Sequence, residues 1–246
     1  MALSVVIPTL NEEQWLPALL ASLAESGLPL DVIVVDGNSD DDTRGATERF
    51  LEAFPPPSSL RFVEAEARSI ALQRNVGAAL ARHDVILFCD ADVVFPEGSL
   101  AQFLAIFEKK GYVVAGPRLA SLEPGVFFAF LYGVIHVLER FFIFVGRPYL
   151  PGGCMLTRKD AFASTGGFDP EVLLGEDVDF SLRVSRFGRC GLIGTGVLVS
   201  SRRAIKYGLG WLFDELPNIA HLIMTGRVKD PERIYYPFGD FGDLKR

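Results

Sequence analysis

Three short stretches of the sequence place acidic and amide side chains directly after apolar runs. They are Pro8-Thr9-Leu10-Asn11-Glu12, the run from Asp36 to Thr43, and Asp90-Ala91-Asp92. Carboxylate and amide oxygens accept hydrogen bonds from a nucleobase and a ribose, whereas phosphates need a cation between them and the acids. Asp90 and Asp92 are hard oxygen ligands of the kind that Mg²⁺ or Mn²⁺ prefers. We therefore predict a metal at these two residues that stabilises a departing nucleoside diphosphate.

A second acidic cluster, Gly175-Glu176-Asp177-Val178-Asp179, follows the turn Gly166-Gly167-Phe168-Asp169 and opens a predicted helix. Acidic residues in a first helical turn are stabilised by the helix dipole, so stabilisation of the helix end would by itself explain them. A carboxylate there could also deprotonate an acceptor hydroxyl, which contributes roughly 10²- to 10⁴-fold to a rate. Both roles are compatible, and Glu176 and Asp177 are the catalytic candidates.

Simpler roles compete for several polar residues. Within Asp40 to Asp42, at least one carboxylate is expected to cap a helix or turn rather than to bind a ligand. Four arginines are candidate partners of a diphosphate, with solvated salt bridges as the alternative: Arg68, Arg74, Arg202 and Arg203. The three histidines, His83, His136 and His221, have no metal-ligand spacing and are expected to be structural.

Composition limits the class of protein. The 246 residues include 24 basic and 31 acidic side chains, a formal charge of −7, which argues against a general attraction to nucleic acid. Three widely spaced cysteines form neither a disulfide framework nor a zinc motif, which indicates a reducing compartment. Residues 1–8 read as a strand and not as a signal peptide, so we expect a cytoplasmic protein, with the inner face of the membrane as an alternative position.

Alternating apolar runs and helical patterns predict an α/β fold with a mostly parallel sheet flanked by helices. The predicted strands are Leu3 to Pro8, Leu30 to Asp36, Leu60 to Glu64, Val85 to Asp90 and Tyr112 to Gly116. The predicted helices are Leu16 to Glu25, Asp42 to Ala53, Ser69 to Ala81, Ser99 to Lys110 and Glu176 to Phe187. We expect one catalytic domain with a ligand-binding half at 1–118 and a smaller acceptor-side lobe at 119–246.

The segment 126–145, VFFAFLYGVIHVLERFFIFV, is apolar and long enough to span a bilayer. It also contains His136, Glu139 and Arg140, which would be costly inside hydrocarbon. We favour a buried core helix, followed by a helix at the membrane interface, with a spanning helix as the last alternative.

Taken together, these motifs resemble the family 2 glycosyltransferases of the GT-A fold, from Leu3 to Arg203. The matching stretches are Val-Ile-Pro-Thr-Leu-Asn-Glu at 6–12, Val-Val-Asp-Gly-Asn-Ser at 34–39, Arg74-Asn75-Val76-Gly77, Phe88-Cys89-Asp90-Ala91-Asp92, Gly152-Gly153-Cys154-Met155, Gly166-Gly167-Phe168-Asp169 and Glu176-Asp177-Val178-Asp179. The resemblance implies an inverting single displacement, with the residue that matches the family's base at Asp177 and with Asp90 and Asp92 contacting ribose and metal.

The same resemblance implies a UDP- or GDP-linked sugar as donor and Mn²⁺ or Mg²⁺ as cofactor. The candidate nucleotide-sugar ligands are Pro8, Thr9, Asn11, Glu12, Asp36, Arg68, Arg74, Asp90, Ala91, Arg202 and Arg203. The Gln-x-x-Arg-Trp motif of processive synthases is absent from the sequence, which favours transfer of a single hexose-type sugar. A polyprenyl phosphate would suit an interfacial helix at 126–145, and a soluble glycan is the alternative acceptor.

Two other functions compete with this reading. An aspartyl phosphatase of the haloacid dehalogenase type would use Asp90 as nucleophile, but that loop normally follows the first strand of its fold, and here it follows the fourth. A nucleotide-sugar-binding module without catalysis is the other alternative, against which an intact Asp177 argues.

Overall fold

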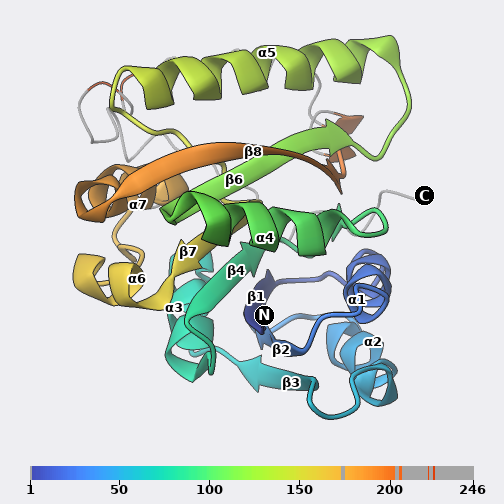
Figure 1. Cartoon of the computed structure of the whole chain (residues 1–246). Helices are drawn as coiled ribbons and strands as arrows, with labels where there is room; N and C mark the ends of the chain where they lie inside the picture. Colours follow the sequence, from blue (N-terminus) through green and yellow to red (C-terminus); the bar gives the residue numbers. More distant parts are fainter. Residues whose placement is uncertain (1, 173–174, 203–204, 207–220, 222–223, 225–246) are drawn as a thin grey trace.

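An eight-stranded sheet forms the centre of the protein in the computed structural model, which describes residues 2–172, 175–202, 205, 206, 221 and 224 (Figure 1). The strands are β1 (Leu3–Thr9), β2 (Leu30–Asp36), β3 (Ser59–Glu64), β4 (Val85–Cys89), β5 (Val93–Val94), β6 (Tyr112–Ser121), β7 (Cys154–Arg158) and β8 (Arg189–Val199). Their order across the sheet is β3-β2-β1-β4-β7-β6-β8-β5. Every residue of β1, β2 and β4 is buried, as continuous apolar runs predict for strands covered on both faces.

The first half of the sheet confirms the predicted parallel arrangement. β2 pairs in parallel with both β1 and β3, and β1 pairs in parallel with β4. The second half is mixed, because β7 lies antiparallel between β4 and β6, while β6 pairs in parallel with β8. The fifth predicted strand is therefore not the direct neighbour of the fourth, and it extends to Ser121. β8 was not predicted, since Gly191, Gly194 and Gly196 interrupt its apolar pattern.

Helices cover both faces of the sheet. They are α1 (Leu16–Ala24), α2 (Thr43–Glu48), α3 (Ile70–Leu80), α4 (Ser99–Lys110), α5 (Val126–Phe144), α6 (Lys159–Thr165) and α7 (Glu176–Val184), with the 3₁₀ turns η1 (Leu51–Ala53) and η2 (Ser185–Phe187). Side chains of α1 and α4 share one buried cluster with one face of the strands, and those of α3, α6 and α7 share a second cluster with the opposite face.

Close packing of α3 on the sheet requires a glycine. A Cβ added at Gly77 of α3 would lie 2.2 Å from Cγ1 of Val6 in β1. The glycine therefore lets α3 approach the sheet closely, which brings the preceding turn of the same helix, with Gln73, against the ends of β1 and β2. The first helix begins at Leu16, as predicted, and Pro17 lies in its first turn, where a proline is tolerated.

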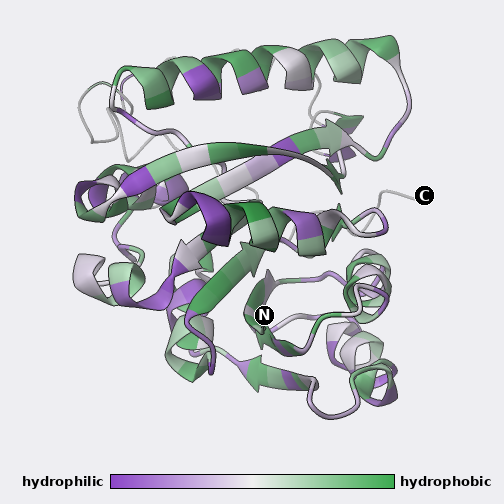
Figure 2. Ribbon diagram, in the orientation of Figure 1, coloured by the Kyte–Doolittle hydropathy of each residue, from purple (hydrophilic) through white to green (hydrophobic). Residues whose placement is uncertain are grey.

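The preferred prediction for 126–145 was wrong. The segment forms α5, which lies along the outside of the molecule over β6 and β8 (Figure 1). Figure 2 shows a predominantly hydrophobic helix, yet its single buried residue is Glu139, and Val126 and Phe144 are 89% and 85% exposed. A core helix would bury its apolar side chains, and α5 directs most of them outward.

Strands from both predicted halves join one sheet, and β6 runs through residue 118. The division into two lobes stays a prediction. The consequence for function is positional. β1, β2 and β4 end at the same edge of the sheet, and the start of β7 lies opposite the end of β4, with Cys154 paired to Cys89. The loops that leave this edge carry the residues predicted to bind a ligand.

Candidate functional site

Two loops that follow β1 and β2 are held together by hydrogen bonds between backbone and side chains. The backbone N–H of Asn11 donates to Oγ of Ser39 at 2.8 Å, and the N–H of Asp40 donates to Oδ1 of Asn11 at 2.8 Å. Asn11 and Asn38 have left-handed backbones, with φ of 58° and 62°, a conformation that asparagine tolerates better than most residues. These hydrogen bonds between the two loops give them a defined shape before any ligand binds.

Asp36 is buried at the end of β2, and its carboxylate is hydrogen-bonded to other residues of the protein. Its carboxylate accepts hydrogen bonds from Oγ1 of Thr9 at 3.0 Å and from the N–H of Ser39 at 2.8 Å. Pro8 and Thr9 close β1 beside it. The carboxylate therefore shapes the candidate nucleoside loop from within.

The predicted capping role is confirmed for one residue of the run Asp40 to Asp42. Oδ1 of Asp42 accepts from the N–H of Gly45 at 3.2 Å and caps α2. Asp40 forms an exposed ion pair of 2.8 Å with Arg68, which also donates to the carbonyl of Asn38. Arg68 thus forms a surface salt bridge, which was the alternative to the predicted contact with a diphosphate.

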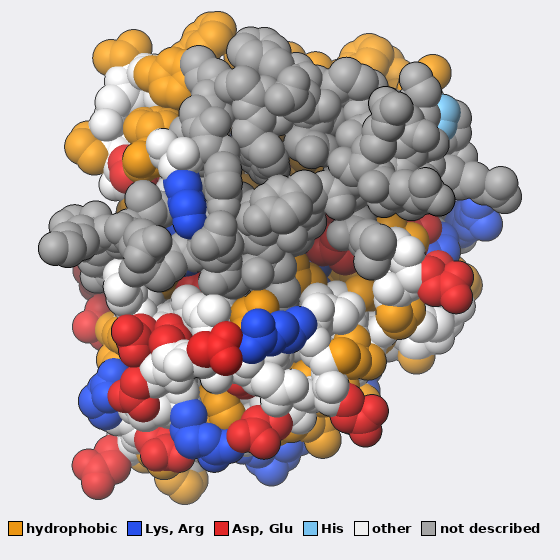
Figure 3. All heavy atoms as spheres, turned by 180° about the vertical axis from the view of Figure 1, so that it is seen from behind, with side chains coloured by type: hydrophobic (Ala, Val, Ile, Leu, Met, Phe, Trp, Pro, Cys, Tyr) orange, Lys and Arg blue, Asp and Glu red, His pale blue; other side chains and the backbone are white. Residues whose placement is uncertain are grey.

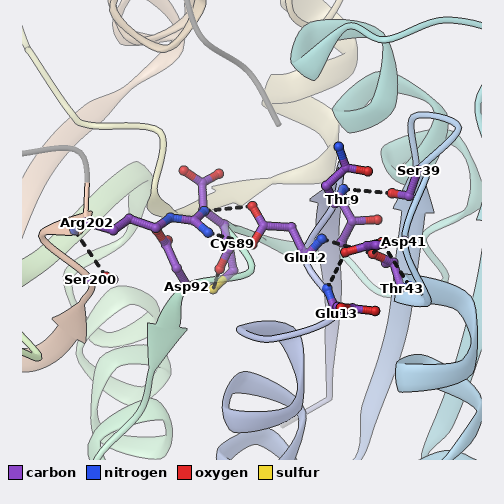
Figure 4. A network of polar contacts seen from close by, with 12 residues as sticks. Thr9, Glu12, Glu13, Ser39, Asp41, Thr43, Cys89, Asp92, Ser200 and Arg202 are labelled. Atoms are coloured by element: carbon purple, nitrogen blue, oxygen red, sulfur yellow. Dashed lines mark hydrogen bonds and ion pairs between the residues drawn. The ribbon is translucent and has the colours of Figure 1, made fainter. Parts of the chain in front are cut away.

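Arg202 joins the first loop to the candidate metal residues (Figure 4). Its guanidinium donates to both oxygens of Glu12, at 2.8 and 2.6 Å, and its Nε lies 2.9 Å from Oδ2 of Asp92. The group lies 5.1 Å from the ring centroid of Trp15 and is buried. Burial raises the pKa of Glu12 to about 7, against the opposing effect of Arg202. Arg203 lies outside the described residues.

Arg74 connects the other carboxylates. Its two terminal nitrogens donate to Glu176 at 2.8 Å, to Asp90 at 3.0 Å and to the carbonyl of Gly152 at 3.1 Å, and its guanidinium lies 5.2 Å from the ring centroid of Phe168. The side chain is 2% exposed. This placement favours a role as an internal counter-ion over the predicted contact with a diphosphate. Burial raises the pKa of Glu176 to about 7, and the nearby Asp177 adds to the shift.

Asp177 lies in the first turn of α7, which begins at Glu176 after the left-handed residue Gly175. Its carboxylate accepts from the N–H of Gly152 at 2.6 Å and from that of Val178 at 2.8 Å. Burial raises the pKa of Asp177, although Arg74 and the two amides oppose the shift. A Cβ at Gly152 would lie 2.9 Å from Cβ of Asp177, so only glycine fits this turn.

Five carboxylates, those of Glu12, Asp90, Asp92, Glu176 and Asp177, share this region with the two guanidinium groups of Arg74 and Arg202. The surplus of acids suits a bound cation. Among the described residues no three metal-ligand side chains come together. Mg²⁺ and Mn²⁺ are commonly held by one or two carboxylates with phosphate and water, so the pair Asp90 and Asp92 fits that mode. Ala91 between them is buried.

Two contributors to the site were not predicted. Nε2 of Gln73 donates to the carbonyls of Thr9 and Val35, both at 2.7 Å, and so ties the ends of β1 and β2 together. Trp15 lies beside Arg202. In the sequence, a polar residue at position 73 on the inward side of α3, next to Arg74, was the signal from which the role of Gln73 could have been predicted. Trp15 offered none, because its partner lies 187 positions later in the chain.

The mostly parallel sheet with acidic loops at its carboxyl edge defines a GT-A type of fold. A solved structure supports this assignment: the mannosyltransferase PcManGT from Pyrobaculum calidifontis, in complex with GDP-Man and Mn²⁺, matches with a TM-score of 0.69 at 20% identity. The match covers 93% of this chain and 66% of that one.

The family model "Glycosyl transferase family 2" matches residues 4–166, and the chain belongs to this family. A pre-mycofactocin glycosyltransferase of Mycobacterium tuberculosis is 30% identical over 201 residues, which cover 75% of this chain and 39% of that protein. An undecaprenyl-phosphate 4-deoxy-4-formamido-L-arabinose transferase of Pectobacterium atrosepticum is 31% identical over 165 residues, 62% of this chain and 47% of that protein. The chain thus spans less than half the length of both relatives.

Proposed function

We propose that the chain is an inverting, metal-dependent glycosyltransferase that moves a single hexose-type sugar from a UDP- or GDP-linked donor to a polyprenyl phosphate or a glycan. The observation that carries the proposal is the meeting of Asp90, Asp92 and Asp177 at one edge of the sheet, from segments more than 80 residues apart. Arg74 links these segments through Asp90 and Glu176.

The donor would lie over the carboxyl ends of β1, β2 and β4. The laced loops at Asn11 and Asp36 are pre-organised to hold a nucleoside, and their carbonyl and carboxylate oxygens suit ribose and base donors. Asp90 and Asp92 would hold Mn²⁺ or Mg²⁺. When bound, that ion would supply positive charge to the leaving diphosphate.

Asp177 suits the role of general base. The two amide donors fix its carboxylate, and a raised pKa makes it a stronger base than an ordinary aspartate. The acceptor oxygen would form the new bond to the anomeric carbon as the bond to the diphosphate breaks. The bonding electron pair leaves with the diphosphate, and the proton of an acceptor hydroxyl moves to Asp177. The attack from the opposite side inverts the anomeric centre.

A lipid-linked acceptor is favoured by two observations. One relative is named for an undecaprenyl-phosphate substrate, and α5 exposes an apolar surface on the same molecule. We accordingly propose a cytoplasmic protein at the inner face of the membrane.

The first experiment is thermal unfolding with UDP, GDP and their common sugar conjugates, each with and without Mn²⁺. A ligand at 100 times its Kd adds about 2.7 kcal/mol, or roughly 5 to 10 °C for a chain of this size. A shift that needs nucleotide and metal together supports the proposal and identifies the base. Stabilisation by Mg²⁺ alone, without response to any nucleotide, would favour the phosphatase alternative, although family membership argues against it.

Two variants separate the roles of the carboxylates. Asp92→Ala is expected to abolish the metal-dependent part of the thermal shift. Asp177→Asn is expected to keep that shift and to lose sugar transfer by roughly 10²-fold or more. Transfer by Asp177→Asn at the parent rate would remove this residue as the base, and donor binding without transfer by the parent would favour the non-catalytic module.

A further inference from the structure

α5 presents an unusual surface, because its outward side is apolar. Eight of its large hydrophobic side chains are exposed by 41% or more: Val126, Phe127, Phe130, Val134, Val137, Leu138, Phe141 and Phe144. At 3.6 residues per turn they fall within roughly 120° around the helix axis. We call these eight side chains the outer face. Figure 3 shows hydrophobic side chains along the edge of the molecule that α5 forms.

The polar residues of α5 lie away from the outer face. Glu139 is 3% exposed, and Oη of Tyr132 lies 3.5 Å from Oγ of Ser201. Phe142 packs against Val178 of α7. The inner side of α5 is thus attached to the body of the protein. A contiguous apolar face of this length on a soluble domain marks a binding surface for another apolar phase.

The charges beside the outer face indicate which phase. Arg140 is exposed at the edge of α5 and Arg118 is exposed on β6, and both lie close enough to His136 to lower its pKa. The acid on α5, Glu139, is buried beneath the helix. An apolar stripe with cations at its border matches a bilayer with anionic headgroups, in which Lys and Arg lie at headgroup level.

A cavity of about 400 Å³ lies on the same flank, between α5 and the start of β8. His136 and Arg140 line it together with Cys190 and Leu192. Its position at the edge of the outer face, with the guanidinium of Arg140 in its lining, suits the phosphate of a lipid headgroup.

We propose that α5 is a membrane-docking helix that lies flat in the interface of an anionic bilayer, with its outer face toward the acyl chains and with Arg140 and Arg118 among the headgroups. The helix is long and apolar enough to cross a membrane. Tyr132 and Phe142 attach the helix to the body of the protein, and Glu139 is buried on the same side, so the helix lies on the surface instead. This surface is additional to the donor site and does not depend on which sugar is transferred.

Docking through α5 would place the candidate active site beside the membrane. Before the helix, Glu123 accepts from the hydroxyl of Ser200 at 2.9 Å and from the N–H of Ser201 at 2.7 Å, next to Arg202. After the helix, the chain leads to Gly152, whose N–H donates to Asp177. The segments before and after α5 therefore both lead to the site, and an acceptor carried by the same membrane would reach it without leaving the interface.

The test is flotation of the full chain with vesicles of phosphatidylcholine, alone and with added phosphatidylglycerol. We expect the parent to float with the anionic vesicles and to be released by alkaline carbonate. Phe130→Ser combined with Phe144→Ser should lower the apparent affinity at least tenfold. Both side chains are at least 70% exposed, so the folded state should be unaffected, which thermal unfolding would verify. The matched control combines Leu51→Ser with Phe187→Ser, two exposed apolar residues outside α5, and should float like the parent.

Arg140→Gln separates the electrostatic contribution. It should weaken binding to anionic vesicles about fivefold, the effect of about 1 kcal/mol per cation, and leave binding to phosphatidylcholine unchanged. Equal flotation of the parent and the double variant in the outer face would overturn the proposal, as would retention of the parent after carbonate, which indicates a spanning helix. A parent that does not float but forms a dimer that the double variant disrupts would assign the outer face to a second copy of the chain.

Discussion

Glu139 provides a quantitative test of how α5 is held against the sheet. Its carboxyl is buried, and burial raises its pKa from 4.5 to about 8. Between these two pH values the folded protein keeps a proton that the unfolded chain has released. The free energy of unfolding therefore falls as the pH rises, by about 1.4 kcal/mol per pH unit at most. Between pH 5 and pH 8 this sums to about 3 kcal/mol of lost stability.

Glu139→Gln removes the titration and keeps the volume of the side chain. The variant should gain about 3 kcal/mol on the parent between pH 5 and pH 8, because other groups titrate equally in both proteins. In thermal unfolding the gap between the two Tm values should widen by roughly 6 to 12 °C over that range. His136, whose Nδ1 lies 3.5 Å from the carboxylate, and the nearby Tyr149 remain in both proteins. Exposed Glu97→Gln is the control for the loss of one glutamate. A gap that stays constant from pH 5 to pH 8 would show that Glu139 meets water in the folded protein.

Two further changes probe the packing behind the site. Gly77→Ala would press a methyl group against Val6 and should lower the free energy of unfolding by roughly 1 to 3 kcal/mol, measured by urea unfolding. Ala79→Gly on the same helix is the control for helix propensity. Unchanged stability of Gly77→Ala would mean that α3 can move away from the sheet. Arg202→Met should lower the free energy of unfolding by roughly 3 to 5 kcal/mol, because it leaves the buried carboxylate of Glu12 without its partner. The double variant with Glu12→Gln should recover part of this loss. If it recovers nothing, the loss comes from packing rather than from charge.

Local signals in the chain were sufficient for the parallel half of the sheet. Continuous apolar runs place β1, β2 and β4, and the predicted bounds of α1 and α4 hold to within one residue, with Pro17 in the first turn of α1 and Gly111 after α4. The predicted helix from Asp42 to Ala53 was too long, because α2 ends at Glu48 and the separate 3₁₀ turn η1 follows. The carboxyl edge of this half collects the residues that follow each strand, so the candidate loops at Asn11, Asp36 and Asp90 were also readable from the sequence. Capping by at least one residue of Asp40 to Asp42 was expected for the same reason, since it is a local interaction, and Asp42 provides it.

Partners that are distant along the chain were not readable. Arg74 was grouped with possible phosphate ligands, and its burial between Asp90 and Glu176 depends on how α3 and α7 pack on one face of the sheet. The antiparallel insertion of β7 likewise depends on pairing across 65 residues, for which a run of five residues carries no directional signal.

The sequence by itself determined the family, the parallel arrangement of the first strands and the types of residues at the strand ends, because these follow from local periodicity and short motifs. Tertiary structure alone decided the side of α5 that meets solvent. A mainly apolar helix has the same composition whether it is buried in a core or laid on a surface, and only the burial of Glu139 and the packing of Phe142 against α7 turn the remaining face outward.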